Sequence, residues 1–426
     1  MRYPGPGPWY AGGIRMKKIY IWGAGFYLKI VYETIDKNSS VISGIIDTDR
    51  QKQGKQWIDG ICIEAPDILL HSEFDYIIIS VKKYQAIAEE CIKMGIGREK
   101  VVPFWSLNED MPCMDAGKRK IIELEEKITQ LRREIRRCNK RMENQPYEFG
   151  LGRQIHIKPS EQLLSNILEK RASLCRFGDG EFEIMRGRER LWYQNMDRGL
   201  SARLKKVLDS EKDNILIAVA DDFGSLEAYT EEAADGIRDY LSGGTRKEVL
   251  DLLDTQRTYY NAYVSRPYMM YRDKTYAERI FKLFKEIWRQ RDVLIVEGQY
   301  TRTGAGNDLL ADANSIRRII CPDTNAYDCY GEIWKAVREN SSDGALVLLS
   351  LGPAATILAF DLAGCGIQAL DIGQLDNEYE WYLSGAAQRV EIKGKTVAEL
   401  NGYHRPENTP EDLLYEGQII AVVARK

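Results

Sequence analysis

The sequence predicts an α/β protein in which two Rossmann-like parallel-sheet domains are joined by a coiled-coil helix. Short apolar runs of strand type alternate with amphipathic stretches near the start of the chain and again in its second half. Such alternation is typical of parallel sheets, whose strands are connected by helices. A charged segment with regularly spaced apolar residues separates the two halves. At 426 residues the chain is long enough for two or three domains of ordinary size.

Composition and charge exclude several classes of protein. The net charge is −4 with a pI of about 5.8, so no basic surface indicates a nucleic acid partner. No apolar run reaches the roughly 18 residues of a membrane span, and no signal segment opens the chain. We therefore expect a cytoplasmic protein. Eight scattered cysteines and three histidines show no zinc-binding spacing.

Residues 1–15 contain three prolines and four glycines and are not expected to form a regular element. Met16 stands directly before a strand-like run. The segment is therefore predicted to be a disordered tail or to precede the natural start.

Residues 16–112 are predicted to form the first domain, with strands at 19–22, 41–46 and 76–80 and helices ending near Ile35 and Met94. Gly23 and Gly25 follow the first strand, and Asp47 follows the second, as in a dinucleotide-binding fingerprint. The third glycine is absent, because Leu28 stands in its place. The segment resembles the Rossmann-like accessory domains of bacterial sugar-modifying enzymes, which favours a role in packing or partner contact over nucleotide binding.

Residues 113–146 are predicted to form a coiled-coil linker helix. Apolar residues recur at alternating steps of three and four, a 3.5-residue period that marks a coiled-coil seam. The seam consists of Ile121, Leu124, Ile128, Leu131, Ile135, Cys138 and Met142. A homodimer follows from this prediction; the alternative is a single long helix that packs on one of the domains.

Residues 147–426 are predicted to form the second domain. Strands are expected at 174–177, 215–220, 293–296, 346–350 and 369–372, and helices at 277–289 and 325–338. The carboxyl ends of parallel strands bind the ligand in open α/β sheets. We therefore expect the functional site at this edge of the sheet.

The most informative segment is Arg176-Phe-Gly-Asp-Gly-Glu-Phe, which follows the first strand of the second domain. Read as extended backbone, it directs Asp179 and Glu181 to the same side. Two converging carboxylates suit Mg²⁺ or Mn²⁺, which can bridge the phosphates of a nucleotide. An ordinary Asp-Gly turn is the alternative.

Seven blocks, in this order, resemble the bacterial GT-D glycosyltransferases, a family with a metal-binding Asp-x-Glu motif. The blocks are 176–182, 193–197, 263–268, 296–298 with 302–309, 321–327, 351–356 and 370–381. The resemblance covers about residues 150–426 and implies that the second domain has the GT-D fold. It also implies that Asp179 and Glu181 bind Mn²⁺ or Mg²⁺ against the diphosphate of a UDP-sugar donor.

The sequence offers further candidates for donor binding and catalysis. Gly352 precedes a predicted helix start that can bind phosphate, and the Arg302 fork matches phosphate oxygens. The donor-binding candidates are Arg176, Gly178, Arg266, Tyr268, Arg302, Asn307, Asp308, Gly352 and Thr356. The catalytic candidates are Asp179, Glu181, Asp376 and Glu378, of which Asp376 or Glu378 would act as the general base. Three have structural alternatives: Tyr268 as a core residue, and Asn307 and Asp308 as the cap of a following helix.

One departure from the family pattern bears on mechanism. Gln374 stands where the family often has a histidine, and glutamine cannot titrate, so acid-base chemistry at that position is in doubt.

The leading hypothesis is a metal-dependent transferase that moves a hexose from a UDP-sugar to a glycan or glycoprotein acceptor, as in cell-surface or adhesin glycosylation. The alternatives are an NAD(P)-dependent oxidoreductase that uses the first domain, and a non-catalytic assembly subunit in which the coiled coil is the functional part.

Overall fold

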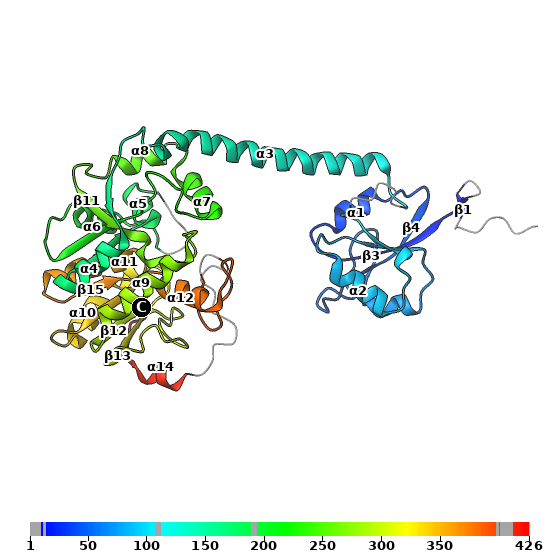
Figure 1. Cartoon of the computed structure of the whole chain (residues 1–426). Coiled ribbons are helices and arrows are strands. Elements are labelled where there is room, and N and C mark those ends of the chain that lie inside the picture. The colour runs from blue at the N-terminus through cyan, green and yellow to red at the C-terminus, as the bar shows by residue number, and fades with distance from the viewer. Residues whose placement is uncertain are drawn as a thin grey trace, which may run out of the picture. The chain divides into compact units, whose positions relative to one another are not determined.

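The computed structural model describes residues 10–11, 14–106, 112–188, 194–397, 400 and 412–425. The chain divides into two compact units, Met1–Ile135 and Arg136–Lys426 (Figure 1). Each unit contains a parallel sheet, which confirms the predicted fold class for both domains. None of the helices in the described parts of the chain is long and apolar enough to cross a membrane.

The first unit is a five-stranded parallel sheet with the order β5-β4-β3-β6-β7. Its strands are β3 (Lys17–Trp22), β4 (Ser40–Ile46), β5 (Ile63–Glu64), β6 (Tyr76–Ile79) and β7 (Val101–Pro103). The helices α1 (Leu28–Thr34) and α2 (Gln85–Lys93) connect them. The central strand β3 supplies the fully buried Ile19 and Ile21. The isoleucine-rich strands thus form the core that the apolar runs predicted.

Two short strands precede this sheet. β1 (Tyr10–Ala11) and β2 (Ile14–Arg15) pair in antiparallel fashion, a regular element that the proline and glycine content did not predict. The rest of the predicted tail lies outside the described residues.

The glycine turn after β3 packs against protein atoms. Gly23 has a φ of +115°, and a Cβ there would lie 2.5 Å from Ser80 Oγ. The carboxylate of Asp47 accepts hydrogen bonds from Ala24 N at 2.7 Å and from Asp49 N at 2.9 Å, and it pairs with Lys52. These contacts occupy the side chain that would bind a ribose in a dinucleotide site. They favour the packing role over nucleotide binding.

α3 (Ala116–Glu148) is a single helix of 33 residues. Its first part packs Ile122 into the core of the first unit. Its last part is bound to the second unit through Arg141 to Asp235 at 3.1 Å and Glu148 to Arg238 at 2.8 Å. The Ile, Leu and Met side chains of the predicted seam, at positions 121–142, do not share in this packing and are 46–62% exposed. The helix is confirmed, and its pairing with a second copy stays a prediction.

The second unit is a nine-stranded sheet with the order β16-β13-β12-β14-β15-β9-β10-β11-β8, in which every paired strand is parallel. The five predicted strands are β9 (Ser173–Phe177), β10 (Ile215–Val219), β12 (Asp292–Gly298), β14 (Leu346–Ser350) and β15 (Ala369–Asp371). The sequence did not predict β8 (His156–Lys158), β11 (Thr258–Asn261), β13 (Ser315–Cys321) and β16 (Ile419–Val422).

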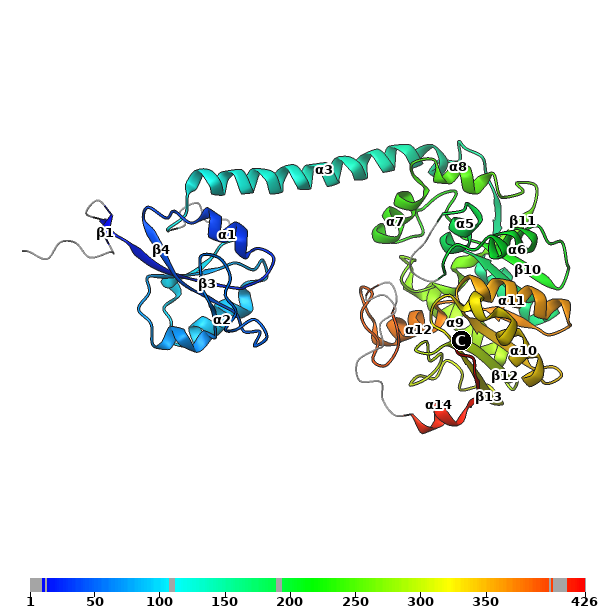
Figure 2. The same cartoon turned by 180° about the vertical axis from the view of Figure 1, so that it is seen from behind.

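Helices cover both faces of this sheet. α5 (Asp179–Met185), α6 (Arg198–Leu208), α7 (Glu231–Leu241), α8 (Thr245–Leu250), α10 (Tyr330–Asn340) and α11 (Pro353–Gly364) share one core cluster. α4 (Ser160–Lys170), α9 (Lys274–Trp288) and α12 (Leu375–Ser384) share the other. α6, α11 and α10 lie side by side on the first face (Figure 2). α14 (Leu413–Gly417) precedes the edge strand β16.

A short strand, β15, lies in the middle of the sheet between β14 and β9. β15 has three residues, which all pair with β14 but pair with β9 at one position, Leu370 with Leu174. The carboxyl ends of β14, β15 and β9 therefore meet at one point of the sheet edge.

Candidate functional site

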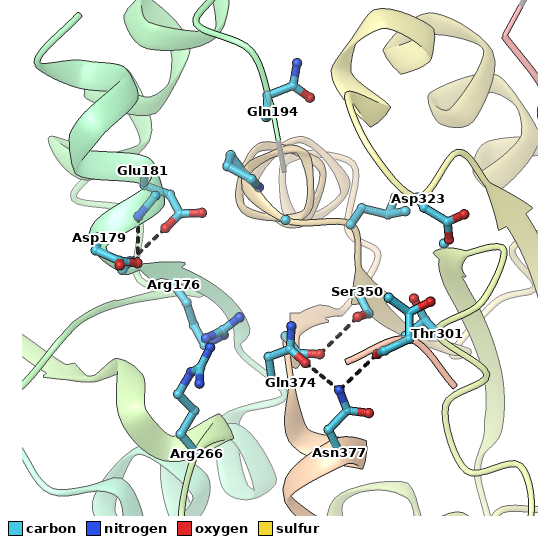
Figure 3. Close-up of a pocket in the computed structure, with 18 of the residues that line it drawn as sticks. Arg176, Asp179, Glu181, Gln194, Arg266, Thr301, Asp323, Ser350, Gln374 and Asn377 are labelled. Carbon is cyan, nitrogen blue, oxygen red and sulfur yellow. Dashed lines mark hydrogen bonds between the residues drawn. The ribbon is translucent and has the colours of Figure 1, made fainter. Parts of the chain in front are cut away.

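A cavity of about 170 Å³ lies at this edge of the second sheet (Figure 3). Its walls come from the carboxyl ends of four strands and the segments after them: Gly178–Glu181 after β9, Gly298 at the end of β12, Ser350–Pro353 at the end of β14 and Gly373 after β15. The prediction of a site at the strand ends thus agrees with the position of this cavity. Among the donor-binding candidates, Arg176, Gly178, Arg266 and Gly352 line it.

Asp179 and Glu181 both line the cavity, but the geometry expected for them is wrong. They belong to the first turn of α5 instead of an extended segment, because Gly178 ends the strand and serves as the helix N-cap. Glu181 turns back so that its Oε2 accepts a hydrogen bond from Gly178 N at 2.8 Å. Asp179 Oδ1 accepts one from Gly180 N at 2.9 Å. An acidic residue at the third helical position is a standard helix start, and here it brings both carboxylates to one wall (Figure 3).

A cation at this wall would offset the cost of ionising a buried carboxylate. Burial raises the pKa of Glu181 to about 7, and the negative charge of Asp371 adds to this effect. Among the described residues, no group of three or more His, Cys, Asp or Glu side chains has the arrangement of a complete metal site. Mg²⁺ is typically held by one or two carboxylates together with substrate phosphates. The pair of carboxylates therefore fits a cation that is completed by a substrate.

Arg176 forms the floor of the site and is held rigidly. Its Nη2 donates to Asp371 Oδ1 at 2.8 Å, its Nε to the Asp371 carbonyl at 2.9 Å and its Nη1 to Ser265 Oγ at 2.8 Å. Gly373 makes room for this guanidinium, since a Cβ at that position would lie 2.0 Å from Arg176 Nη2. Arg266 reaches the same region from the loop after β11 (Figure 3). Two arginines in one cavity match a diphosphate.

The other side of the cavity carries polar groups that the sequence analysis missed. Thr301 and Asp323 stand there, across from Asp179 (Figure 3). Gln194 Nε2 and Thr396 Oγ1 also belong to the lining residues, are buried and have no hydrogen-bond partner in the described structure. Gln194 lies in the block 193–197 that resembles the GT-D family, whereas Thr396 follows a segment with no motif. Tyr193 of the same block lies outside the described residues.

The proposed bases Asp376 and Glu378 are engaged in other contacts. Asp376 lines the cavity, yet its Oδ1 accepts from Gly304 N and Asn307 Nδ2, each at 2.9 Å, and its Oδ2 from Lys395 Nζ at 2.7 Å. Glu378 is fully buried, and its Oε2 accepts from the backbone N–H groups of residues 268 and 269. Both carboxylates therefore hold loops in place.

The remaining donor-binding candidates lie outside the cavity wall. Tyr268 is a core residue that packs against Tyr382, as its structural alternative predicted. Thr356 is fully buried and donates to the Arg176 carbonyl at 2.8 Å, so it positions β9. Arg302 packs over the ring of Tyr415 at 4.4 Å, beneath α14.

The helix expected after Asn307 and Asp308 is wrong, because residues 303–312 form turns and bends. Asn307 Nδ2 donates to Asp376 and Glu380, and Asp308 accepts from Lys285 Nζ and Tyr379 OH. These two residues tie the turn to α12 and α9.

Comparison with known proteins bears directly on this domain. The model of the family "Glycosyltransferase GT-D fold" matches residues 174–400, more than half of the chain. The chain belongs to this family. A second model, "C2185-like, N-terminal", matches residues 15–102.

Two curated relatives are similar to the chain. A probable glycosyl transferase, Gly, of Streptococcus gordonii is 40% identical over 277 residues, which are 64% of this chain and 40% of the relative. The glycosyltransferase GlyD of Streptococcus pneumoniae is 35% identical over 271 residues, 63% of this chain and 32% of the relative. The chain thus spans less than half the length of these relatives.

Solved structures give the same result for the fold. One described as a new glycosyltransferase from Streptococcus sanguinis is 40% identical, with a TM-score of 0.60, and covers 64% of this chain and 100% of that chain. Another, described as having a distinct glycosyltransferase fold, is 35% identical, with a TM-score of 0.60 and coverage of 63% and 96%. The family predicted from the seven blocks is therefore confirmed.

Proposed function

We propose that this GT-D family member is a glycosyltransferase that moves a hexose from a UDP-sugar to a glycan or glycoprotein acceptor, in cell-surface or adhesin glycosylation. One observation carries the proposal: two carboxylates, Asp179 and Glu181, and the clamped Arg176 line one cavity at the carboxyl ends of the strands. The names of the similar proteins support it.

The residues of the cavity divide the work. Asp179 and Glu181 would hold Mn²⁺ or Mg²⁺, which when bound neutralises the charge of the diphosphate leaving group. Arg176 and Arg266 bind the phosphate oxygens, because a guanidinium matches them in pairs. The unpartnered Gln194 Nε2 and Thr396 Oγ1 offer hydrogen bonds to the uridine or the hexose. The fixed position of Arg176 keeps this arrangement in place before the donor arrives.

The other two hypotheses receive less support. The carboxylate of Asp47 is bound to backbone N–H groups and Lys52, which disfavours an oxidoreductase centred on the first domain. A purely structural subunit would have no need of an arginine, Arg176, that three hydrogen bonds fix beneath a polar cavity. The glycosyltransferase proposal explains both the clamp and the unpartnered polar atoms.

Donor turnover tests the proposal. Purified full-length protein is given a panel of nucleotide sugars with Mn²⁺ or with EDTA, and UDP release is measured together with UDP affinity by titration calorimetry. We expect metal-dependent release from UDP-hexoses. The variant Asp179→Asn/Glu181→Gln should lose metal-dependent UDP binding. No turnover and no UDP binding by the wild type under any of these conditions would overturn the proposal.

The chain offers a matched control for these carboxylates. Asp209 and Glu211 have the same spacing but are exposed before β10, and neither is among the residues that line the cavity. Asp209→Asn/Glu211→Gln removes the same charge and should leave turnover and UDP affinity unchanged. An equal loss in both double variants would mean that net charge, and not the cavity, determines the effect.

We also propose that the enzyme is a homodimer through α3. The exposed seam residues repeat with a 3.5-residue period over about three heptads, which is near the lower limit for a stable coiled coil. Sedimentation equilibrium should give a dimer for the wild type and a monomer for Leu124→Glu/Leu131→Glu. Gln130→Glu/Lys127→Glu, which changes exposed positions outside the seam, is the control. A monomeric wild type would refute this proposal.

A further inference from the structure

A second cavity, of about 410 Å³, adjoins the first. The two share four lining residues: Arg176, Gly178, Asp179 and Arg266. The walls that the second cavity does not share come from the end of β10, from α7 and from the segment after β11. It therefore lies on the β10 side of the residues that we assign to the diphosphate. A molecule in it would face the donor across Asp179 and the two arginines.

Asp222 is the distinctive side chain of this second cavity. It is 4% exposed, and its Oδ1 has no hydrogen-bond partner in the described structure. Its Oδ2 accepts a hydrogen bond from Tyr263 OH at 3.3 Å. The nearby guanidinium of Arg246 donates instead to the Phe223 carbonyl and to Asn144 Oδ1. Buried polar atoms are rarely left without a partner, and where such an oxygen lies in a cavity wall a bound ligand or water can donate to it.

A second polar atom of the same cavity is also unpartnered. Tyr240 OH, from α7, is buried without a hydrogen-bond partner in the described structure. The wall further contains the ring of Tyr263 and the charged side chains of Glu232 and Arg389. Aromatic faces and charged hydrogen-bonding groups together suit a sugar, which presents apolar ring faces and hydroxyl groups. The cavity is therefore built for a polyhydroxyl compound.

We propose that this second cavity binds the acceptor sugar and that Asp222 is the general base of the transfer. This inference rests on the proposed function. The acceptor hydroxyl gives its proton to Asp222 while its oxygen forms a bond to the anomeric carbon of the donor. The bond from that carbon to the β-phosphate oxygen breaks, and UDP leaves with the electron pair. Such a single displacement inverts the anomeric configuration.

The contacts of the other carboxylates support this assignment. Both oxygens of Asp376 already accept hydrogen bonds, and Glu378, which holds the backbone at residues 268 and 269, is not among the residues that line either cavity. Asp222 faces a cavity and has an open oxygen. Burial raises the pKa of Asp222 to about 8, with Arg246 opposing and Asp221 and Asp179 adding to the rise. A pKa near neutrality suits a group that must accept a proton in the reaction.

The test compares Asp222→Asn with Asp221→Asn in the full-length protein. Asp221 is the adjacent carboxylate and is not among the residues that line either cavity. Acceptors are p-nitrophenyl glycosides of glucose, galactose and N-acetylglucosamine, and the donor is the UDP-sugar that the wild type uses. Where none of these glycosides is glycosylated, donor hydrolysis is the readout, because water then takes the place of the acceptor. UDP affinity and thermal unfolding are measured for each variant.

We expect Asp222→Asn to keep the UDP affinity of the wild type and to lose turnover by about 100-fold or more, as for loss of a general base. Asp221→Asn should keep both. The product or released sugar should have the inverted configuration by NMR. Full turnover by Asp222→Asn, a loss of UDP affinity equal to the loss of turnover, or retained configuration would overturn the inference. An inactive wild type would instead overturn the proposed function.

Discussion

Replacing Gly373 by alanine should disturb the site through one atom. The added Cβ would lie 2.0 Å from Arg176 Nη2, and contacts under 3.0 Å are essentially never seen, so the guanidinium must move by about 1 Å. That movement breaks or weakens the 2.8 Å hydrogen bond to Asp371, which is 3% exposed. The φ of +49° at this position adds strain for any residue with a Cβ.

The magnitude follows from these contacts. The backbone strain costs about 1–2 kcal/mol, and loss of a hydrogen bond to a charged group costs about 1.5–3 kcal/mol. We therefore expect a loss of about 2–5 kcal/mol in the free energy of unfolding. If one such bond to the diphosphate is lost as well, UDP affinity falls by about 10- to 100-fold.

Gly366→Ala separates the clash from the strain. Gly366 has a φ of +78°, but a Cβ there meets nothing within 4 Å. Urea unfolding and titration calorimetry with UDP and Mn²⁺ should show about 1–2 kcal/mol of destabilisation with unchanged affinity for this control. UDP affinities for the two variants within about twofold of each other would refute the reasoning about the arginine clamp.

Three further predictions concern buried carboxylates of the second unit. Burial holds the pKa of Asp222 at about 8, above its value in the unfolded chain, so its ionisation opposes folding and stability is lost as the pH rises from about 4 through 8. Urea unfolding across this range should show that Asp222→Asn becomes more stable than the wild type as the pH rises. Parallel pH profiles of stability for the two proteins would contradict this. Glu378→Ala leaves two buried N–H groups unpaired and should cost about 1–3 kcal/mol for each, with the KM for the donor unchanged; a fall in kcat without destabilisation would restore its role as the base. Glu297→Ala should cost about 3–5 kcal/mol, because it leaves the Arg318 guanidinium buried without its 2.7 Å partner. A smaller loss in Glu297→Ala than in Arg317→Ala, which removes a half-buried arginine of the same strand, would contradict this.

The fold was largely predictable because most buried strands are continuous apolar runs. The run Leu346–Ser350 became β14 without any change of bounds. β13 escaped prediction because Arg317 and Arg318 interrupt its apolar pattern. Arg318 is nevertheless 2% exposed, since Glu297 from the neighbouring strand neutralises it. A pairing between strands cannot be read from either strand alone.

The site was predictable as a set of segments but less so as side chains. Asp179 and Glu181 were chosen from their spacing, and both line the cavity, although on a helix turn. Arg302 has the chemistry of a phosphate ligand, yet Tyr415, more than a hundred positions later in the chain, draws it under α14. Asp222 carries no motif beyond a pair of aspartates. Its open oxygen depends on where Arg246 finds its partners, which only the tertiary structure reveals.

The single ladder pair between β15 and β9 has a consequence for the motions of the second unit. One backbone ladder pair, Leu370 with Leu174, joins two groups of strands, beside the side-chain hydrogen bonds of Arg176 to Asp371, and each group contributes to the cavity wall. Partial unfolding begins in the part of a structure with the fewest backbone hydrogen bonds. We therefore expect the sheet to separate transiently between β15 and β9. A nucleotide that contacts both groups of strands would then stabilise them against separation. Bound donor should slow amide hydrogen exchange in β15 and β9 more than in β12. Release of UDP should restore the faster exchange.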